Sequence, residues 1–369
     1  MATKLRYVGL DVHKDSIVVA VADSGRQPAE VFKKLANDFH LLKKALTKLG
    51  PPERLRICYE AGPTGFDLAR RLTEAGYHCE VIAPSLVPQH SGKKRIKTDR
   101  RDARNLAQFY RSGSLTPICI PERQTEAMRD LERARDDAKH AERAAKHQLD
   151  KFLLRHGRNY TDGKKWTKRH WEWIARQAFP EGAQQYVLED YVAAVKAATQ
   201  RVQQLTDEIG RQVETWTLLP LVQALTALRG FQQLSAVIVA AEIGDFARFA
   251  HPSSLMDFVG LVPSESSSGE KRWQGRITGA GNGHVRRILV EAAWAYQFAP
   301  RPGREIRQRR EAVAPQFKVI AEKAEQRLCR RFRALRARGK PSQKVVTAIA
   351  RELAGFVWAI AQEQRRLAS

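Results

Sequence analysis

Four acidic residues that could hold a metal ion lie at three separate places along the chain. Asp11 and Glu60 each end an apolar run, whereas Asp99 and Asp102 lie within a strongly basic run over 93–104. Mg²⁺ takes oxygen ligands, usually from only a few carboxylates, and completes its shell with water and substrate phosphate. Two such ions about 3.5–4 Å apart can stabilise both the attacking and the leaving oxygen of a phosphodiester displacement. The four residues therefore predict a site for Mg²⁺, or for Mn²⁺ in its place, that acts on nucleic acid.

Each of these acids also has an ordinary structural explanation. An Asp at the end of a strand often forms a turn, and Asp99 could cap the helix that we expect over 99–112. Asp99 and Asp102 lie one turn apart on that helix, so they share a face. It is the joint pattern, in a strongly basic chain, that favours a metal site over separate structural roles.

The chain carries a large excess of positive charge. Its 369 residues include 64 Lys and Arg against 40 Asp and Glu, a formal net charge of +24. A polyanion stabilises such a surplus, and nucleic acid is the commonest one. An anionic membrane is the rival partner, but we identify no apolar run near the ~20 residues of a membrane span. Lys4 and Arg6 interrupt the start that a signal peptide needs. We therefore predict a cytoplasmic protein with no membrane partner.

The first 115 residues alternate between strand and helix patterns. Runs rich in β-branched residues predict strands, at 5–10, 16–22, 30–34, 55–60 and 79–83. Apolar residues at helical spacing, or the breaks that flank them, predict helices, at 39–49, 64–75 and 99–112. This order predicts an α/β domain with a mixed sheet, in which Asp11 and Glu60 can lie on neighbouring strands.

Two long helices are expected between residues 116 and 217. Apolar residues recur at steps of three and four over 122–155, and every seven residues over 186–217. Such repeats predict a coiled coil, either as an antiparallel pair within the chain or as a dimer interface. The basic and aromatic stretch 164–173 between them is either a small helical cap packed by its tryptophans or a contact to nucleic acid, whose bases stack on aromatic rings.

The remainder, 218–369, is predicted to be mostly helical. We expect helices at 234–243, 283–298, 316–337 and 342–365, with a loop rich in Gly and Ser over 262–283. The sequence thus predicts three parts, which are an α/β domain (1–115), a coiled-coil oligomerisation segment (116–217) and a helical domain (218–369).

Several motifs resemble a known family. Gly-Leu-Asp-Val-His-Lys at 9–14 is similar to the RuvC-like, RNase H-fold half of bacterial insertion-sequence DEDD transposases, known as bridge-RNA-guided recombinases. The other motifs that carry the resemblance, in the family's order, are 60–65, 97–103, 258–271, 277–282 and 285–289. The first two of these extend the RuvC-like half, and the last three resemble the family's C-terminal transposase domain.

The resemblance implies a second catalytic element in the helical domain. In the family a nucleophilic serine directly precedes the glycine of a Ser-Gly pair, which here is Ser268 before Gly269. A serine hydroxyl can attack a phosphodiester and hold the broken strand as a phosphoserine, which conserves the bond for religation. The simpler interpretation is a flexible serine-rich loop, and Ser267 is the nucleophile if the register differs by one.

Basic and polar residues near these motifs are the candidate contacts to nucleic acid. They are Lys93, Lys94, Arg95, Lys97, Lys271, Arg272, Arg276, Asn282, Arg286 and Arg287. The family often has Lys where Gly279 stands, so Lys271, Arg272 or Arg276 would have to supply that charge. Charged residues on helices are more often surface charges than specific contacts.

The resemblance implies a DNA transposase or recombinase that moves an insertion sequence by Mg²⁺-assisted cleavage, serine-linked exchange and religation. Its expected partners are the element ends and target DNA, a structured non-coding guide RNA that reads sequence by base pairing, and further copies of the chain in a dimer or tetramer. It would act in the bacterial cytoplasm at the nucleoid. Two alternatives stay open. The first is a RuvC-like nuclease that cuts Holliday junctions or other DNA structures and whose acids activate water. The second is a non-catalytic nucleic-acid scaffold.

Overall fold

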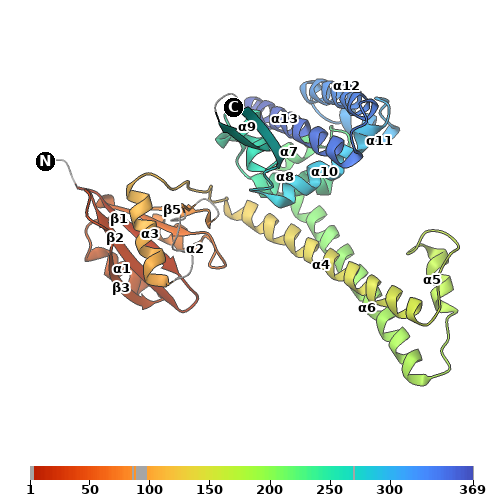
Figure 1. Cartoon of the computed structure of the whole chain (residues 1–369), viewed down its shortest axis with the longest axis horizontal. Coiled ribbons are helices and arrows are strands. Elements are labelled where there is room, and N and C mark those ends of the chain that lie inside the picture. The colour runs from red at the N-terminus through yellow and green to blue at the C-terminus, as the bar shows by residue number, and fades with distance from the viewer. Residues whose placement is uncertain (1–3, 85–86, 89–97, 269–270, 369) are drawn as a thin grey trace. The chain divides into compact units, whose positions relative to one another are not determined.

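The computed structural model describes residues 4–84, 87–88, 98–268 and 271–368 (Figure 1). The chain divides into two compact units, Met1–Ile120 and Pro121–Ser369. The second unit contains both the predicted oligomerisation segment and the predicted serine domain, so the division into three parts by function stays a prediction.

A five-stranded mixed sheet forms the centre of the first unit, in the order β3-β2-β1-β4-β5. The strands are β1 (Arg6–Val12), β2 (Ser16–Asp23), β3 (Glu30–Ala36), β4 (Leu55–Glu60) and β5 (His78–Ile82). β1, β2 and β3 pair antiparallel, whereas β1, β4 and β5 pair parallel. The predicted mixed sheet is confirmed, and β1 and β4 are direct neighbours in it.

Helices cover both faces of this sheet. α1 (Phe39–Thr47) and α2 (Asp67–Glu74) pack on one face, and α3 (Asp99–Arg111) packs on the other (Figure 1). α3 lies directly on β1 because Gly9 has no side chain. A Cβ atom at Gly9 would lie 2.4 Å from the carbonyl oxygen of Ala103. This close approach brings the start of α3 to the end of β1.

Two long antiparallel helices begin the second unit. α4 (Arg123–Arg155) and α6 (Gly182–Val213) are joined through the short helix α5 (Lys168–Ala175). Gln124 Nε2 near the start of α4 donates to the carbonyl of Thr215 just beyond α6, at 3.1 Å. The predicted seven-residue repeat is buried along α6, at Leu188, Val195, Val202 and Ile209. The antiparallel pair is confirmed, and a coiled coil with a second chain stays a prediction.

The segment that joins the long helices is a packed cap. Trp166, Trp171 and Trp173 pack against the apolar cluster that includes Phe152 of α4 and Ile174 of α5. Of the two interpretations of this stretch, the small helical cap agrees with the structure.

The rest of the second unit is a helical body with one core. Its helices are α7 (Leu219–Leu225), α8 (Gln233–Ile243), α9 (Pro252–Phe258), α10 (Gly283–Ala293), α11 (Arg304–Glu311), α12 (Pro315–Ala337) and α13 (Ser342–Ala368). α13 contacts α7, α9, α10 and α12. Contrary to the sequence interpretation, α13 is long and apolar enough to cross a membrane by length and composition. Its apolar residues, such as Ile349 and Leu353, are buried in the body, as expected of a core helix.

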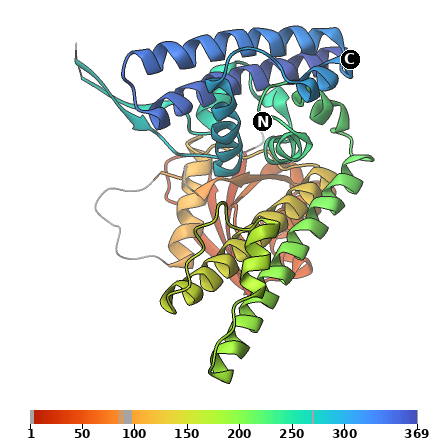
Figure 2. The same ribbon diagram turned by 90° about the vertical axis from the view of Figure 1, so that its right-hand side faces the viewer.

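A β-hairpin replaces the predicted loop over 262–283. β6 (Pro263–Ser268) pairs antiparallel with β7 (Lys271–Ile277) and projects from the helical body (Figure 2). The expectation of a loop was wrong because the serines of β6 resemble turn residues, whereas the pairing with β7 is a tertiary effect. Two glycines with positive φ close the base of the hairpin. A Cβ atom at Gly260 would lie 2.1 Å from the Ala280 carbonyl oxygen, and one at Gly281 2.1 Å from that of Phe258.

Candidate metal centre of the first unit

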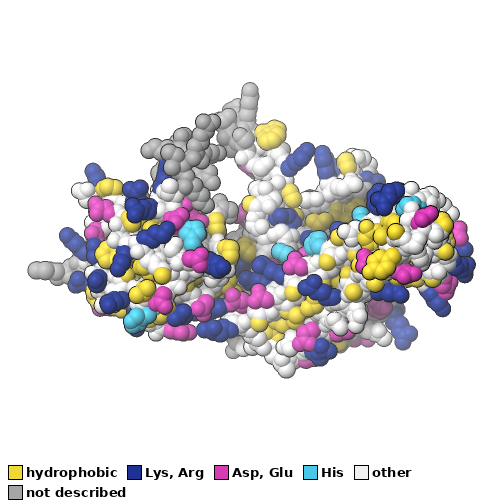
Figure 3. Space-filling model, turned by 90° about the horizontal axis from the view of Figure 1, so that it is seen from below, with side chains coloured by type: hydrophobic (Ala, Val, Ile, Leu, Met, Phe, Trp, Pro, Cys, Tyr) yellow, Lys and Arg dark blue, Asp and Glu magenta, His cyan; other side chains and the backbone are white. Residues whose placement is uncertain are grey.

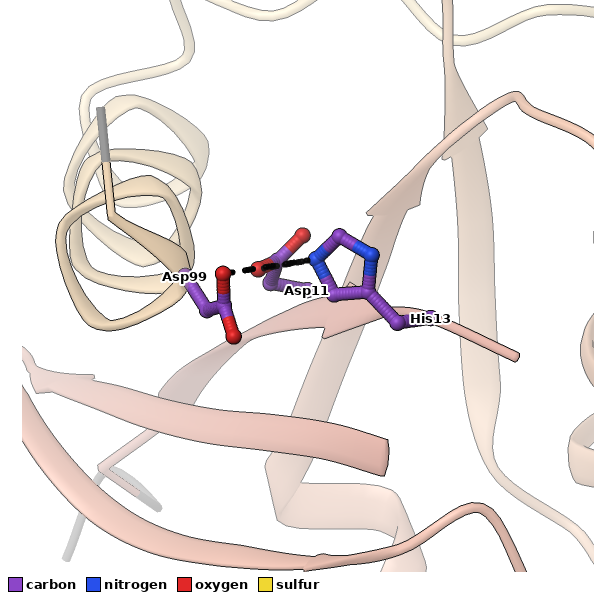
Figure 4. Close-up of side chains that lie close together, drawn as sticks. All are labelled: Asp11, His13 and Asp99. Carbon is purple, nitrogen blue, oxygen red and sulfur yellow. Dashed lines mark hydrogen bonds and ion pairs between the residues drawn. The ribbon is translucent and has the colours of Figure 1, made fainter. Parts of the chain in front are cut away.

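Asp11, His13 and Asp99 lie together on the first unit (Figure 4). His13 Nε2 lies 3.0 Å from Asp11 Oδ2 and 3.6 Å from Asp99 Oδ1. One ligand atom from each residue lies within 4.8 Å of the other two. The start of α3 thus brings a second carboxylate, from Asp99, to the carboxylate and imidazole at the end of β1.

Local structure fixes each of these side chains. Asp11 lies near the end of β1, and His13 begins the turn to β2, where its backbone N–H donates to the Ser16 carbonyl at 2.8 Å. Asn37 Nδ2 donates to the His13 carbonyl at 2.7 Å and holds this turn from the other side. Asp99 is the first residue of α3, whose N-cap is Thr98. The alternative role of Asp99 as the helix cap is therefore wrong, and its carboxylate is available to the site.

The charges at this site repel one another. Burial raises the pKa of the Asp11 carboxyl, as do the neighbouring charges of Asp99 and Asp102, although His13 opposes the shift. The half-buried Asp99 behaves differently, because its hydrogen bond from Lys34 Nζ, at 3.1 Å, lowers its pKa. A divalent cation would relieve the repulsion around Asp11.

The other two predicted ligands approach the same edge of the sheet. The parallel pairing of β1 and β4 ends at Leu10 and Tyr59, so Asp11 and Glu60 follow on adjacent strands. Glu60 is half-buried at the end of β4. Asp102 lies one turn after Asp99 on α3, near enough to raise the pKa of Asp11. The structure thus places the four acids of the prediction around one end of β1, and their roles as ligands stay predictions.

The donor set fits a divalent metal ion. Carboxylate oxygens suit Mg²⁺ and Mn²⁺, and an imidazole nitrogen suits the transition metals. Asp11, His13 and Asp99 offer both kinds of donor. With these ligands, bound metal would supply charge that stabilises a phosphate in displacement.

Two residues of this site, His13 and Lys34, were missed by the sequence reasoning. His13 had a usable signal, since it follows Asp11 by only two residues and directly continues the strand that carries Asp11. Lys34 had none. It lies on β3, and only the strand order brings its ammonium group to Asp99.

The predicted nucleophile belongs to the second unit. Ser268 is the last residue of β6 and pairs through its backbone with Lys271 of β7. The side chains of Ser266, Ser267 and Ser268 lie outside what the structure describes. The catalytic role of Ser268, or of Ser267 in its place, stays a prediction.

The candidate contacts to nucleic acid fall into three groups. Lys93, Lys94, Arg95 and Lys97 lie outside the described residues, as do the side chains of Lys271 and Arg272. Arg276 is exposed on β7.

The third group makes bonds within the protein. Asn282 caps α10 by accepting from the Val285 N–H at 3.0 Å. Arg286 Nη1 donates to the Val259 carbonyl at 2.8 Å, and Arg287 pairs with Asp136 at 3.0 Å. These bonds hold the base of the hairpin and α10 in place, and a role in binding nucleic acid stays a prediction. On the face shown in Figure 3, basic side chains are interspersed with acidic ones.

Comparisons with known proteins find transposase sequences similar to both the N-terminal and the C-terminal parts of the chain. The model of the Transposase IS116/IS110/IS902 family matches residues 222–306, and the transposase model DEDD_Tnp_IS110 matches residues 8–157. The chain is 43% identical over 368 residues to "Putative transposase y4qE" of Sinorhizobium fredii. The alignment covers 98% of this chain and 90% of that protein. It is 30% identical to the transposase for insertion sequence element IS1533 of Leptospira borgpetersenii, over 90% of this chain and 97% of that protein.

These matches define the class of protein as a DNA transposase. More narrowly, the chain belongs to the IS110/IS116 family of DEDD transposases. The family implies an RNase H-like fold for the N-terminal region, in agreement with the mixed sheet of the first unit. The activity of the chain is therefore DNA transposition.

Proposed function

We propose that this transposase moves an insertion sequence by metal-assisted strand cleavage with a covalent serine intermediate. The observation that carries the proposal is the convergence of Asp11, His13 and Asp99, with Asp102 beside them. Mg²⁺ or Mn²⁺ held there would neutralise charge on a scissile phosphate. Such a site needs a nucleophile, and in this proposal it is Ser268, the serine before Gly269.

In the proposed exchange, the Ser268 hydroxyl loses its proton and its oxygen forms a bond to phosphorus. The bond between phosphorus and a strand oxygen breaks, and that oxygen leaves as a hydroxyl. Attack by the hydroxyl of another strand reverses the step and regenerates the serine. No net hydrolysis occurs, so each phosphodiester that breaks is replaced by another.

The residues of the first unit would position the phosphate. Asp11, Asp99, Asp102 and Glu60 would hold metal, and His13 would add a nitrogen ligand or orient Asp11. Until metal or phosphate binds, the ammonium group of Lys34 would keep the Asp99 carboxylate ionised. The proposed partners are the element ends and target DNA, a structured guide RNA, and a second or further copies of the chain. The proposed location is the nucleoid of the bacterial cytoplasm.

Substitution of the serine tests the mechanism. Purified protein, Mg²⁺, labelled element DNA and the RNA transcribed from the element are combined, and protein–DNA adducts are resolved on a denaturing gel. Wild type and Ser253→Ala, an exposed serine on α9, should form the adduct, whereas Ser268→Ala should not. Loss of the adduct in Ser267→Ala instead would shift the register by one.

The same experiment separates the alternatives. A nuclease that activates water is indicated if Ser268→Ala still cleaves, with hydroxyl ends and no adduct. The observation that supports this alternative is the cluster of Asp11, His13 and Asp99, all three of which belong to the first unit. A scaffold is indicated if the wild type never cleaves with its own RNA and DNA.

A further inference from the structure

A second group of metal-ligand side chains lies in the second unit. Glu132 of α4, Glu242 of α8 and His284 of α10 each place one ligand atom within 4.8 Å of the other two. Glu132 is 1% exposed and Glu242 is 3% exposed. We call these three residues the buried cluster. None of them is among the residues that predicted the metal site of the first unit.

Two members of the buried cluster have no hydrogen-bond partner among the described residues. Both carboxyl oxygens of Glu132 and the Nδ1 atom of His284 are buried and make no hydrogen bond within the described residues, although the Asp136 carboxylate lies 3.8 Å from that Nδ1. A polar group buried without a partner costs several kcal/mol in general. Since the atoms that lack partners are all good metal ligands, the cost points to a ligand that contacts them.

Glu242, by contrast, is held by strong partners. Arg133 donates to both of its oxygens, at 2.6 and 3.0 Å, and Asn282 Nδ2 donates to Oε2 at 2.6 Å. Carboxylates that bind metal are usually fixed by hydrogen bonds of this kind from outer residues. These contacts keep Glu242 ionised and aim it at Glu132.

A proton is the competing occupant. Burial and the adjacent Glu242 raise the pKa of Glu132 to about 9, so without a cation the group would be neutral at pH 7. A proton shared by the two carboxylates would join one oxygen of Glu132 to Glu242. It would leave the second oxygen of Glu132 and the His284 nitrogen without a hydrogen bond. A metal ion would contact all three side chains and so account for the imidazole as well.

The surrounding charges restrict which cation fits. Arg133 faces Glu242, Arg287 pairs with Asp136 at 3.0 Å, and Asp136 Oδ2 lies 3.8 Å from His284 Nδ1. The guanidinium of Arg129 is also near, and it donates to the Ala241 carbonyl. Beside these positive groups, a weakly bound ion such as Mg²⁺ would not compete. Zn²⁺ binds imidazole and carboxylate together much more strongly.

We propose that Glu132, Glu242 and His284 bind a transition-metal ion, best Zn²⁺, that fastens α4 to α8 and α10. Three protein ligands and a water would complete a tetrahedral shell. α4 is one of the two long helices, and α8 and α10 belong to the helical body. The ion would therefore fix the long helices to the body that carries the β6–β7 hairpin.

Zinc content tests the proposal in a background that lacks the first site. The full-length Asp11→Ala/Asp99→Ala protein is stripped with chelator, incubated with Zn²⁺, desalted and measured for metal. We expect about one retained equivalent and a higher melting temperature than in the stripped protein. Adding Glu132→Gln or His284→Gln should abolish both effects.

Matched substitutions control for unspecific binding. Asp130→Asn and His140→Gln change exposed residues of α4 by the same chemistry, and both should retain the zinc and the shift in melting temperature. The proposal is overturned if the double variant retains no zinc, or if Glu132→Gln and His284→Gln retain as much as the controls. Circular dichroism verifies folding, and His284→Gln, at a half-buried position, decides the matter if Glu132→Gln does not fold.

Discussion

The two acidic clusters of this transposase use the same side-chain types in opposite surroundings. Asp11, His13 and Asp99 lie at the edge of a sheet, with the Asp99 side chain 42% exposed, where a large polyanion can approach. Glu132 and Glu242 are closed inside the second unit. A site at the surface lets substrate reach a bound metal ion, whereas a site enclosed by protein is shielded from DNA. This difference agrees with our two proposals, a catalytic role for the first cluster and a structural role for the second.

The largest expected effect is loss of activity in Asp11→Asn. The substitution removes a proposed metal ligand, so DNA cleavage should fall by roughly 100-fold or more, in the range seen when one electrostatic stabiliser is lost. Stability should hold or rise, because burial and the charges of Asp99 and Asp102 disfavour ionised Asp11. Cleavage assays and thermal melts measure the two effects.

Asp23→Asn is the control for this loss. Asp23 lies on the neighbouring strand β2 and pairs with Arg6 at 2.6 Å, and this bond lowers its pKa. The change should leave cleavage intact. Asp23 lies opposite Arg6, at the other end of β1 from Asp11. Equal loss of activity in both variants would therefore mean that general disturbance of the sheet, and not loss of the proposed metal ligand, causes the effect.

The closed cluster should respond in stability. Glu242→Gln removes the negative partner of the half-exposed Arg133 and should cost about 2 kcal/mol of unfolding free energy, within the range for a hydrogen bond to a charged group. Glu132→Gln in metal-free protein should cost much less, because the neutral amide replaces a carboxyl whose pKa is already raised to about 9. Chemical denaturation of stripped proteins provides the comparison. Equal costs would show that Glu132 is ionised and paired in the apo protein.

A third buried acid, Glu142, shows how full pairing with lysines changes the pKa of a carboxylate. Glu142 of α4 accepts from Lys139 and Lys146, both at 2.6 Å, and from Thr199 of α6 at 3.2 Å. Burial raises its pKa, but the two lysines outweigh this and lower it to about 2. Its unfolded pKa is higher, so its stabilisation is present above about pH 4.5 and is lost as the pH falls toward about 2.

Acid titration of stability measures this effect. Between pH 5 and 3, wild type should lose more stability than Glu142→Gln, with a difference of roughly 2 kcal/mol from the linkage. The exposed neighbour Asp137 provides a control in Asp137→Asn, which should follow the wild type. Parallel curves for wild type and Glu142→Gln would contradict the pairing.

Local patterns predicted the first site better than the second. Asp11, Glu60, Asp99 and Asp102 each stand beside a recognisable strand or helix start, and parallel pairing of β1 with β4 brings two of them together. The buried cluster joins α4, α8 and α10, and more than a hundred residues separate Glu132 of α4 from Glu242 of α8. No local pattern marks such a contact. The hairpin was missed for the same reason, since β6 has the composition of a loop and gains its structure from β7.

The smallest expected effect concerns Lys34, whose substitution should change metal binding at the exposed site without changing stability. Its ammonium group bonds to Asp99 Oδ2 at 3.1 Å, on an exposed surface where ion pairs contribute little to stability. Lys34→Gln should therefore leave the melting temperature almost unchanged. It should nevertheless strengthen Mn²⁺ binding at the first site by a few-fold, because the cation no longer competes with a lysine for Asp99. Lys33→Gln, on the same strand and equally exposed to solvent, is the matched control. Calorimetric titration of both variants with Mn²⁺ measures the difference, and equal affinities would show that Asp99 does not bind the metal.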